Sequence, residues 1–149
     1  ETMTPEQLQQ YLYQHIPLSA AMQVSVTTLA DDHVTLQAPL TPNINYHETV
    51  FGGSASTLAI LSAWSLLNTR LHNAGLDCTL VIQRNSMEYE KPITGEFTAT
   101  AYIPLTENWE KFLRTFARMG KARITVVSTL RLETDRVGLF QGEFVALQR

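Results

Sequence analysis

Hydrophobic and polar positions follow two different periods along this chain, and their order predicts helices in some segments and strands in others. Apolar residues recur at helical spacing in the stretch that Thr4 and Pro5 open and Pro17 closes, whereas alternate positions are apolar in residues 24–28 and 34–40. The expected elements are a helix of residues 5–16, a hairpin of strands 24–28 and 34–40, helices of residues 54–73 and 106–119, and strands of residues 78–90, 96–104, 122–133 and 137–147.

The helix of residues 54–73 is apolar nearly all round in its first three turns, which indicates that it is buried on most sides. Gly75 follows it and can take the left-handed conformation that ends a helix. Six strands curled around this helix would explain why it has no polar face. The pattern therefore predicts an α+β fold, a six-stranded antiparallel sheet wrapped around a long buried central helix, in one domain of residues 1–149.

The loop before the central helix, Asn45-Tyr-His-Glu-Thr-Val-Phe-Gly-Gly-Ser54, carries the candidate chemistry. Asn45 offers a side-chain amide, and the pair Gly52-Gly53 opens the helix, where backbone N–H groups and the positive end of the helix dipole meet. Together these groups can hold a developing negative charge on a carbonyl oxygen. We therefore predict a site for carbonyl chemistry, with Asn45, Gly53 and Ser54 as its catalytic residues.

Composition and charge narrow the classes of function. A net charge of −3 and a pI near 5.8 argue against nucleic-acid binding. The most apolar run, residues 58–67, is shorter than the roughly 20 residues that span a bilayer. The chain starts without signal-peptide features, so we expect a soluble cytoplasmic protein in which Glu1 and Thr2 are additions before Met3. The single cysteine, Cys78, is expected to be a small core residue, and no Cys/His spacing suggests a metal or another cofactor.

The order of elements and the loop motif together resemble the hotdog fold of acyl-thioester enzymes, and within it the family of YiiD C-terminal thioesterase domains. The resemblance covers nearly the whole chain, and its specific part is N-x5-FGGS-x3-LA-x4-W from Asn45 to Trp64. The segment Glu90-Lys91-Pro92-x2-Gly95 is a weaker match. The resemblance implies a homodimer or a dimer of dimers, with the pocket between protomers. It also implies a substrate carried on phosphopantetheine, as a thioester of acyl carrier protein (ACP) or of coenzyme A.

This chain departs from the common hotdog thioesterase pattern at two positions. Many such enzymes carry a histidine before the Gly-Gly pair and an Asp or Glu seven residues after it, where Phe51 and Ile60 stand here. Hydrolysis needs an activated water or a nucleophile, whereas decarboxylation of a malonyl thioester needs a stabilised enolate and a desolvated carboxylate. Members of the resembled family are linked to malonyl-ACP decarboxylation. The resemblance thus favours that reaction, which gives acetyl-ACP for the initiation of fatty-acid synthesis.

Two other functions remain open: a thioesterase with His47 or Glu48 as an atypical base, and a non-catalytic module that binds acyl thioesters. Individual residues also have plainer interpretations, because Asn45 could serve only an Asx turn and Ser54 only as a helix cap rather than a nucleophile. Likewise, Gly52-Gly53 could serve only close packing, and His47-Glu48 could be a solvated loop pair. The expected substrate pocket comprises Tyr46, His47, Glu48, Val50, Phe51, Gly52, Ile60 and Trp64.

Basic residues are concentrated in and just after the helix of residues 106–119. Five of the eleven Lys and Arg residues occur there: Lys111, Arg114, Arg118, Lys121 and Arg123. They could form a solvated helix face, or a landing site for an acidic carrier protein or the phosphates of coenzyme A. Arg84 and Lys91 are weaker candidates for the same task.

Overall fold

The computed structural model describes residues 2–149, and its first helix begins as the sequence predicts. In α1 (Pro5–His15), Thr4 Oγ1 accepts from the Gln7 N–H at 3.1 Å, and the Thr4 N–H donates to Gln7 Oε1 at 2.9 Å. Pro17 ends α1 but also starts a second short helix, α2 (Pro17–Ala21), which the pattern did not predict. Proline suits the first position of a helix as well as it ends the preceding one.

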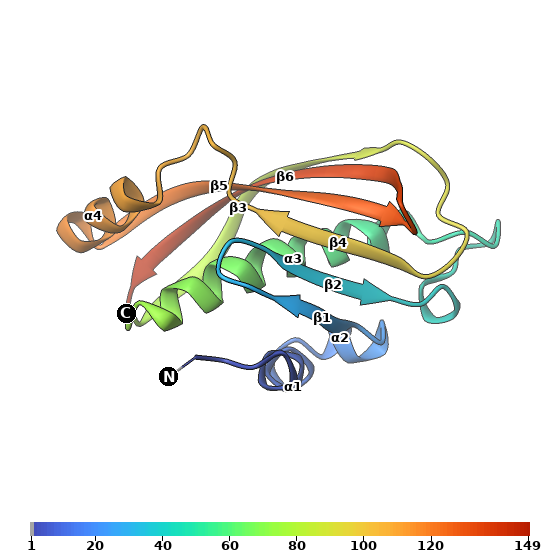
Figure 1. Cartoon of the computed structure of the whole chain (residues 1–149), viewed down its shortest axis with the longest axis horizontal. Helices are drawn as coiled ribbons and strands as arrows, with labels where there is room; N and C mark the ends of the chain where they lie inside the picture. Colours follow the sequence, from blue (N-terminus) through green and yellow to red (C-terminus); the bar gives the residue numbers. More distant parts are fainter. Residues whose placement is uncertain (1) are drawn as a thin grey trace.

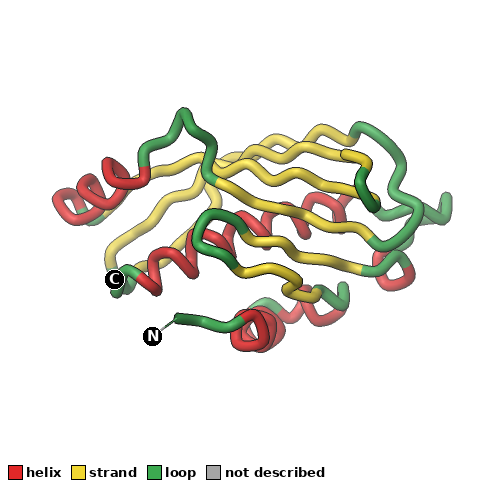
Figure 2. Tube along the Cα trace, viewed as in Figure 1, coloured by secondary structure: helices red, strands yellow, loops and turns green. Residues whose placement is uncertain are grey.

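All six predicted strands are present and form one antiparallel sheet. They are β1 (Ser25–Leu29), β2 (Val34–Ala38), β3 (Cys78–Tyr89), β4 (Phe97–Tyr102), β5 (Lys121–Leu132) and β6 (Asp135–Gln148). Their spatial order is β1-β2-β4-β5-β6-β3, so β1 and β3 are the two edges of the sheet. The sheet curls over the central helix, as the yellow strands in Figure 2 show.

The central helix, α3 (Gly52–Asn73), packs against five of the six strands and is buried along most of its surface. Ser62 Oγ lies 2.8 Å from Ser128 Oγ of β5, which ties the middle of the helix to the sheet. One narrow stripe of α3 stays partly exposed and includes Gly53, Ile60 and Trp64. The expectation of a sheet wrapped around a long central helix, the hotdog fold, is confirmed.

The remaining helix, α4 (Trp109–Met119), lies in the connection between β4 and β5. Asn108 caps its start by accepting from the Lys111 N–H at 3.0 Å, and Gly120 ends it in the left-handed conformation. Figure 1 shows α4 at the far end of the molecule from the start of α3. Its Trp109 ring lies 4.2 Å from the guanidinium of Arg70, near the C-terminal end of α3.

Candidate functional site

The loop that leads into α3 is anchored by long-range hydrogen bonds. Asn43 ends the short 3-10 helix η1 (Thr41–Asn43), is buried, and donates from Nδ2 to the carbonyls of Met22 at 3.0 Å and Pro39 at 2.8 Å. Its own carbonyl accepts the N–H of Phe51 at 2.7 Å, and the N–H of Val50 donates to the carbonyl of Ile93. These bonds fix where the helix begins.

Asn45, the predicted catalytic amide, is part of the internal bonding of this loop. Its Oδ1 accepts from the N–H groups of His47 at 2.8 Å and Thr49 at 3.1 Å, and its Nδ2 donates to Thr49 Oγ1 at 3.0 Å. This is the Asx-turn arrangement that the sequence left as an alternative. An amide nitrogen carries two hydrogens, so one Nδ2 hydrogen of the half-buried side chain stays free to meet a ligand.

The helix begins at Gly52, two residues before the predicted start, and Phe51 occupies the capping position without a side-chain cap. The prediction that Ser54 supplies a donor N–H therefore needs correction, because that N–H donates to the Phe51 carbonyl at 2.9 Å. Ser54 is not the helix cap either. No acceptor for the N–H groups of Gly52 and Gly53 is found within residues 2–149, which leaves these two as the unpaired donors of the first turn.

The side chain of Phe51 folds back over Gly53. A Cβ at position 53 would lie 2.3 Å from Phe51 Cε2, so only glycine fits under the ring in this arrangement. Phe51 is 57% exposed, which is unusual for a phenylalanine. An apolar ring therefore stands beside the helix N-terminus where many hotdog thioesterases have an ionisable imidazole.

A cavity of about 370 Å³ lies beside the start of α3 and the end of β3. Gly52 and Ala55 line it from the helix, and Met87 and Tyr89 line it from the strand. Its full lining is Thr49, Val50, Gly52, Ala55, Met87, Tyr89, Glu90, Lys91, Pro92, Ile93 and Val137. Of the predicted pocket residues, only Val50 and Gly52 line this cavity, and Lys91 joins them from the set of basic candidates.

The other predicted pocket residues lie elsewhere. Tyr46 and His47 stack against each other at 3.9 Å at the exposed tip of the loop, and Glu48 follows them with a positive φ of 64°. Ile60 and Trp64 belong to the exposed stripe of α3, about 12 and 18 Å along the helix axis from Gly52 at the usual rise. Trp64 donates from Nε1 to the Leu80 carbonyl of β3 at 3.3 Å.

The carboxylates of β3 and of the residue that follows it are poorly placed to act as bases. Both oxygens of Glu90 accept from the guanidinium of Arg136, at 2.9 and 2.7 Å. Glu88 alternates with Met87 and Tyr89 along β3, so it lies on the opposite face of the strand. The helix α3 itself carries no Asp or Glu. Hydrogen-bond donors and apolar walls thus dominate the start of α3.

The basic candidates are divided among separate surfaces. Lys111 and Arg123 line one cavity of about 340 Å³ between α4 and β5, and Lys121 and Arg123 line a second of about 490 Å³ with Gln83. Arg114 and Arg118 are exposed on α4, and Arg84 lines a small groove with Glu143. The helix α4, with Lys111, Arg114 and Arg118, lies far from the start of α3 (Figure 1), and Arg84 lies in the middle of β3. Of these basic candidates only Lys91 lines the cavity beside Gly52.

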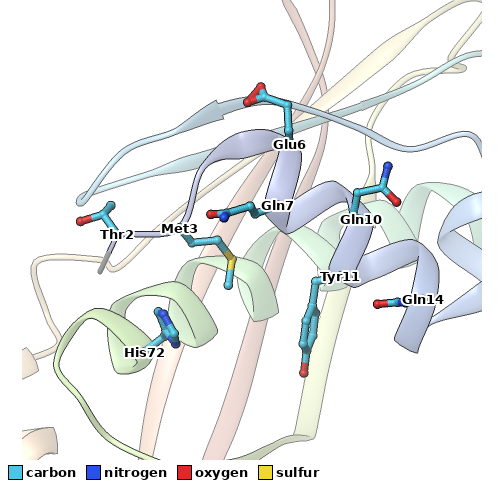
Figure 3. A pocket seen from close by; sticks show the side chains of 8 residues that line it. All are labelled: Thr2, Met3, Glu6, Gln7, Gln10, Tyr11, Gln14 and His72. Atoms are coloured by element: carbon cyan, nitrogen blue, oxygen red, sulfur yellow. The ribbon is translucent and has the colours of Figure 1, made fainter.

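A larger cavity, of about 710 Å³, separates α1 from the C-terminal end of α3 (Figure 3). Glutamine side chains of α1 and the ring of Tyr11 line one side, and His72 of α3 stands across from them. His72 is twenty residues from Gly52, about 30 Å along the helix. This cavity contains neither the glycine donors nor Asn45, so the candidate site remains at the start of α3.

Cys78 packs against the core at the beginning of β3, as expected for a structural residue. Burial raises the pKa of its thiol, so less thiolate is present at a given pH than for an exposed cysteine. We predict that iodoacetamide modifies Cys78 more slowly at pH 8 in the native protein than in urea. A native rate equal to the rate in urea would contradict this prediction.

Two structural absences hold for the part of the chain that the structure describes. No helix among residues 2–149 is long and apolar enough to cross a membrane. The same residues contain no group of three or more His, Cys, Asp or Glu side chains arranged to hold a metal ion.

Comparison with known proteins places this geometry in a family. A crystal structure of a protein of unknown function from Chlorobaculum tepidum TLS superposes with a TM-score of 0.90 at 29% identity, covering 99% of both chains. A "putative thioesterase" from Shewanella oneidensis has a TM-score of 0.86 at 26% identity, covering 96% of both chains. A thioesterase from Haemophilus influenzae shares the fold, with a TM-score of 0.80 at 14% identity, covering 99% of this chain and 93% of that one.

The family description "Putative thioesterase (yiiD_Cterm)" matches residues 5–148. This match includes the anchored loop, the glycine pair and the whole of α3. The chain therefore belongs to the YiiD C-terminal family of hotdog-fold, thioesterase-type proteins.

Proposed function

We propose that this protein decarboxylates a malonyl thioester carried on ACP or coenzyme A, at the start of α3. One observation carries the proposal: within the described part of the chain, the start of α3 offers backbone N–H donors without acceptors, but no free carboxylate beside them to act as a base. The N–H groups of Gly52, which lines the cavity, and of Gly53 have no acceptor among residues 2–149, whereas Glu90, the carboxylate that lines the cavity, is held by Arg136. Decarboxylation needs the donors and has no use for a base.

The reaction follows from these groups. The C–C bond to the substrate carboxylate breaks, CO2 leaves, and the electron pair moves onto the thioester carbonyl oxygen as an enolate. The N–H of Gly53, the dipole of α3 and the free Nδ2 hydrogen of Asn45 would stabilise that oxygen. A solvent proton then adds to the carbanionic carbon and gives the acetyl thioester.

The apolar surroundings support the same reaction. Val50 and Ile93 in the cavity and the ring of Phe51 beside Gly53 would desolvate the substrate carboxylate, which raises its free energy relative to the transition state. Lys91, at the rim of the cavity, is the basic residue placed to meet a phosphate of the pantetheine arm. This contact would serve a thioester of ACP and a thioester of coenzyme A alike, because both carry the pantetheine phosphate.

Thioester hydrolysis is the second candidate, and the family match favours it. The family and the Shewanella oneidensis and Haemophilus influenzae proteins are all described as thioesterases, the first two with the word "putative". The same oxyanion donors would serve a tetrahedral intermediate. A water-activating group would have to come from His47 or Glu48, both exposed at the loop tip, or from a second copy of the chain.

We also propose that a second copy of this chain binds along β3 and forms a homodimer. The edge strand β3 is 12 residues long and pairs only with β6 among the described residues, although Val81 on it is exposed. Long unpaired edges recruit another strand. A homodimer joined along β3 would cover the exposed stripe of α3 and enclose the site from Gly53 to Ile60. Light scattering after size-exclusion chromatography measures this assembly.

Mass spectrometry of malonyl-ACP turnover tests the proposed reaction directly. We expect acetyl-ACP and CO2 to form without release of free holo-ACP, and malonyl-CoA serves as the parallel substrate. Release of free thiol from malonyl or other acyl thioesters would favour hydrolysis instead. Tight acyl-thioester binding with no product would identify a binding module and overturn both enzymatic proposals.

A further inference from the structure

Tyr89 reaches from the sheet to Gly52, and nothing in the sequence pattern pointed to it. It is the last residue of the edge strand β3 and is 59% exposed. Its hydroxyl donates to the Gly52 carbonyl at 3.3 Å. Its ring lies against the same residue, since a Cβ at position 52 would be 3.4 Å from Tyr89 Cε1.

This hydrogen bond acts on the neighbouring N–H through the geometry of the peptide unit. The Gly52 carbonyl and the Gly53 N–H belong to one planar trans peptide and point in opposite directions. Fixing the oxygen therefore fixes the direction of the N–H. The helical hydrogen bonds of α3 also restrain this turn, and the Tyr89 bond adds a restraint where two consecutive glycines lower the stiffness of the backbone.

The hydrogen bond also strengthens the donor. A peptide whose carbonyl accepts a hydrogen bond is polarised, so its N–H becomes a better donor at the other end of the unit. The Tyr89 hydroxyl donates on one side of this peptide, and the Gly53 N–H on the other side has no acceptor among residues 2–149.

We propose that Tyr89 is a positioning residue, which holds the Gly52–Gly53 peptide so that the Gly53 N–H meets the thioester carbonyl oxygen. The inference rests on the proposed function for its effect on rate. It predicts no contact between Tyr89 and the reacting atoms.

The kinetic test is Tyr89→Phe, which removes the hydroxyl and keeps the ring. We expect kcat for malonyl-thioester turnover to fall about fivefold to tenfold, the scale of one neutral hydrogen bond, with KM unchanged. Tyr102→Phe, at an exposed tyrosine of β4 without a hydrogen-bond partner among the described residues, is the matched control and should leave kcat unchanged. An unchanged kcat in Tyr89→Phe would overturn the inference.

The pH profile separates positioning from proton donation. If Tyr89 supplied the proton to the enolate, the alkaline limb of the kcat profile would disappear in Tyr89→Phe. A positioning residue lowers the whole profile and leaves its shape unchanged. Loss of the alkaline limb therefore contradicts the role proposed here.

A spectroscopic readout keeps this inference separate from the proposed function. In the ¹⁵N spectrum of the intact protein, Tyr89→Phe should shift the amide resonance of Gly53 and leave that of Gly75, at the other end of α3, in place. Wild-type protein that turns over no thioester would contradict the proposed function alone. An unshifted Gly53 amide would overturn the role of Tyr89, whatever the turnover.

Discussion

Asn45→Asp is expected to slow thioester turnover by about 100- to 1,000-fold while leaving the loop folded, because one oxyanion donor contributes on this scale. Aspartate keeps the oxygen that accepts from the His47 and Thr49 N–H groups, and the Thr49 hydroxyl can donate to the second oxygen. It removes the Nδ2 hydrogen that would face the substrate. It also adds a negative charge that repels the carboxylate of a malonyl group.

Two further variants separate the loss of the Asn45 donor from a loss of loop structure and from a general effect of an Asn→Asp substitution. Asn45→Ala loses the loop bonds as well as the donor, so it should lower both the melting temperature and the rate. Asn108→Asp is the matched control: Asn108 also accepts a backbone N–H, at the start of α4, and aspartate caps a helix equally well. Wild-type kcat in Asn45→Asp would show that Asn45 is a loop clamp only.

The fold was predictable where its determinants are local in the sequence. The apolar periods of α1, α3, α4 and the six strands are properties of each segment, and all of these elements were found close to the predicted bounds. The sequence pattern places the start of α3 at residue 54, too late by two residues, because serine is a favoured N-cap residue. What sets that start is the bond from the Phe51 N–H to the Asn43 carbonyl and the anchoring of Val50 to Ile93, and no local pattern contains either.

The site was predictable only in part for the same reason. Asn45 and the glycine pair stand in one short motif, so the sequence itself predicts that they form one site. Tyr89 lies 37 residues after Gly52, and it reaches the helix only because β3 pairs outside β6 and ends beside the start of α3. Helical spacing places Ile60 on the face of Gly53, but it does not tell which face of α3 the sheet leaves open.

Ile60→Asp should turn the protein toward hydrolysis. Position 60 lies two helical turns after Gly53 on the exposed stripe of α3, where many hotdog thioesterases carry their acid. A positioned general base contributes about 100- to 10,000-fold, so we expect release of free thiol from acetyl-CoA to rise at least about 100-fold. Decarboxylation of the malonyl thioester should fall, because the new charge opposes the substrate carboxylate.

The control variant for Ile60→Asp carries its substitution on the same exposed stripe of α3. Thr57→Asp places the same charge one turn nearer to Gly53, at a residue whose hydroxyl donates to the Gly53 carbonyl. Equal gains in both variants would mean that added charge, rather than position, drives hydrolysis. No gain in Ile60→Asp would show that the missing acid is not what withholds hydrolysis from this site. A gain at position 60 alone, with decarboxylation lost, would mean that one side chain decides which of two reactions the shared oxyanion donors serve.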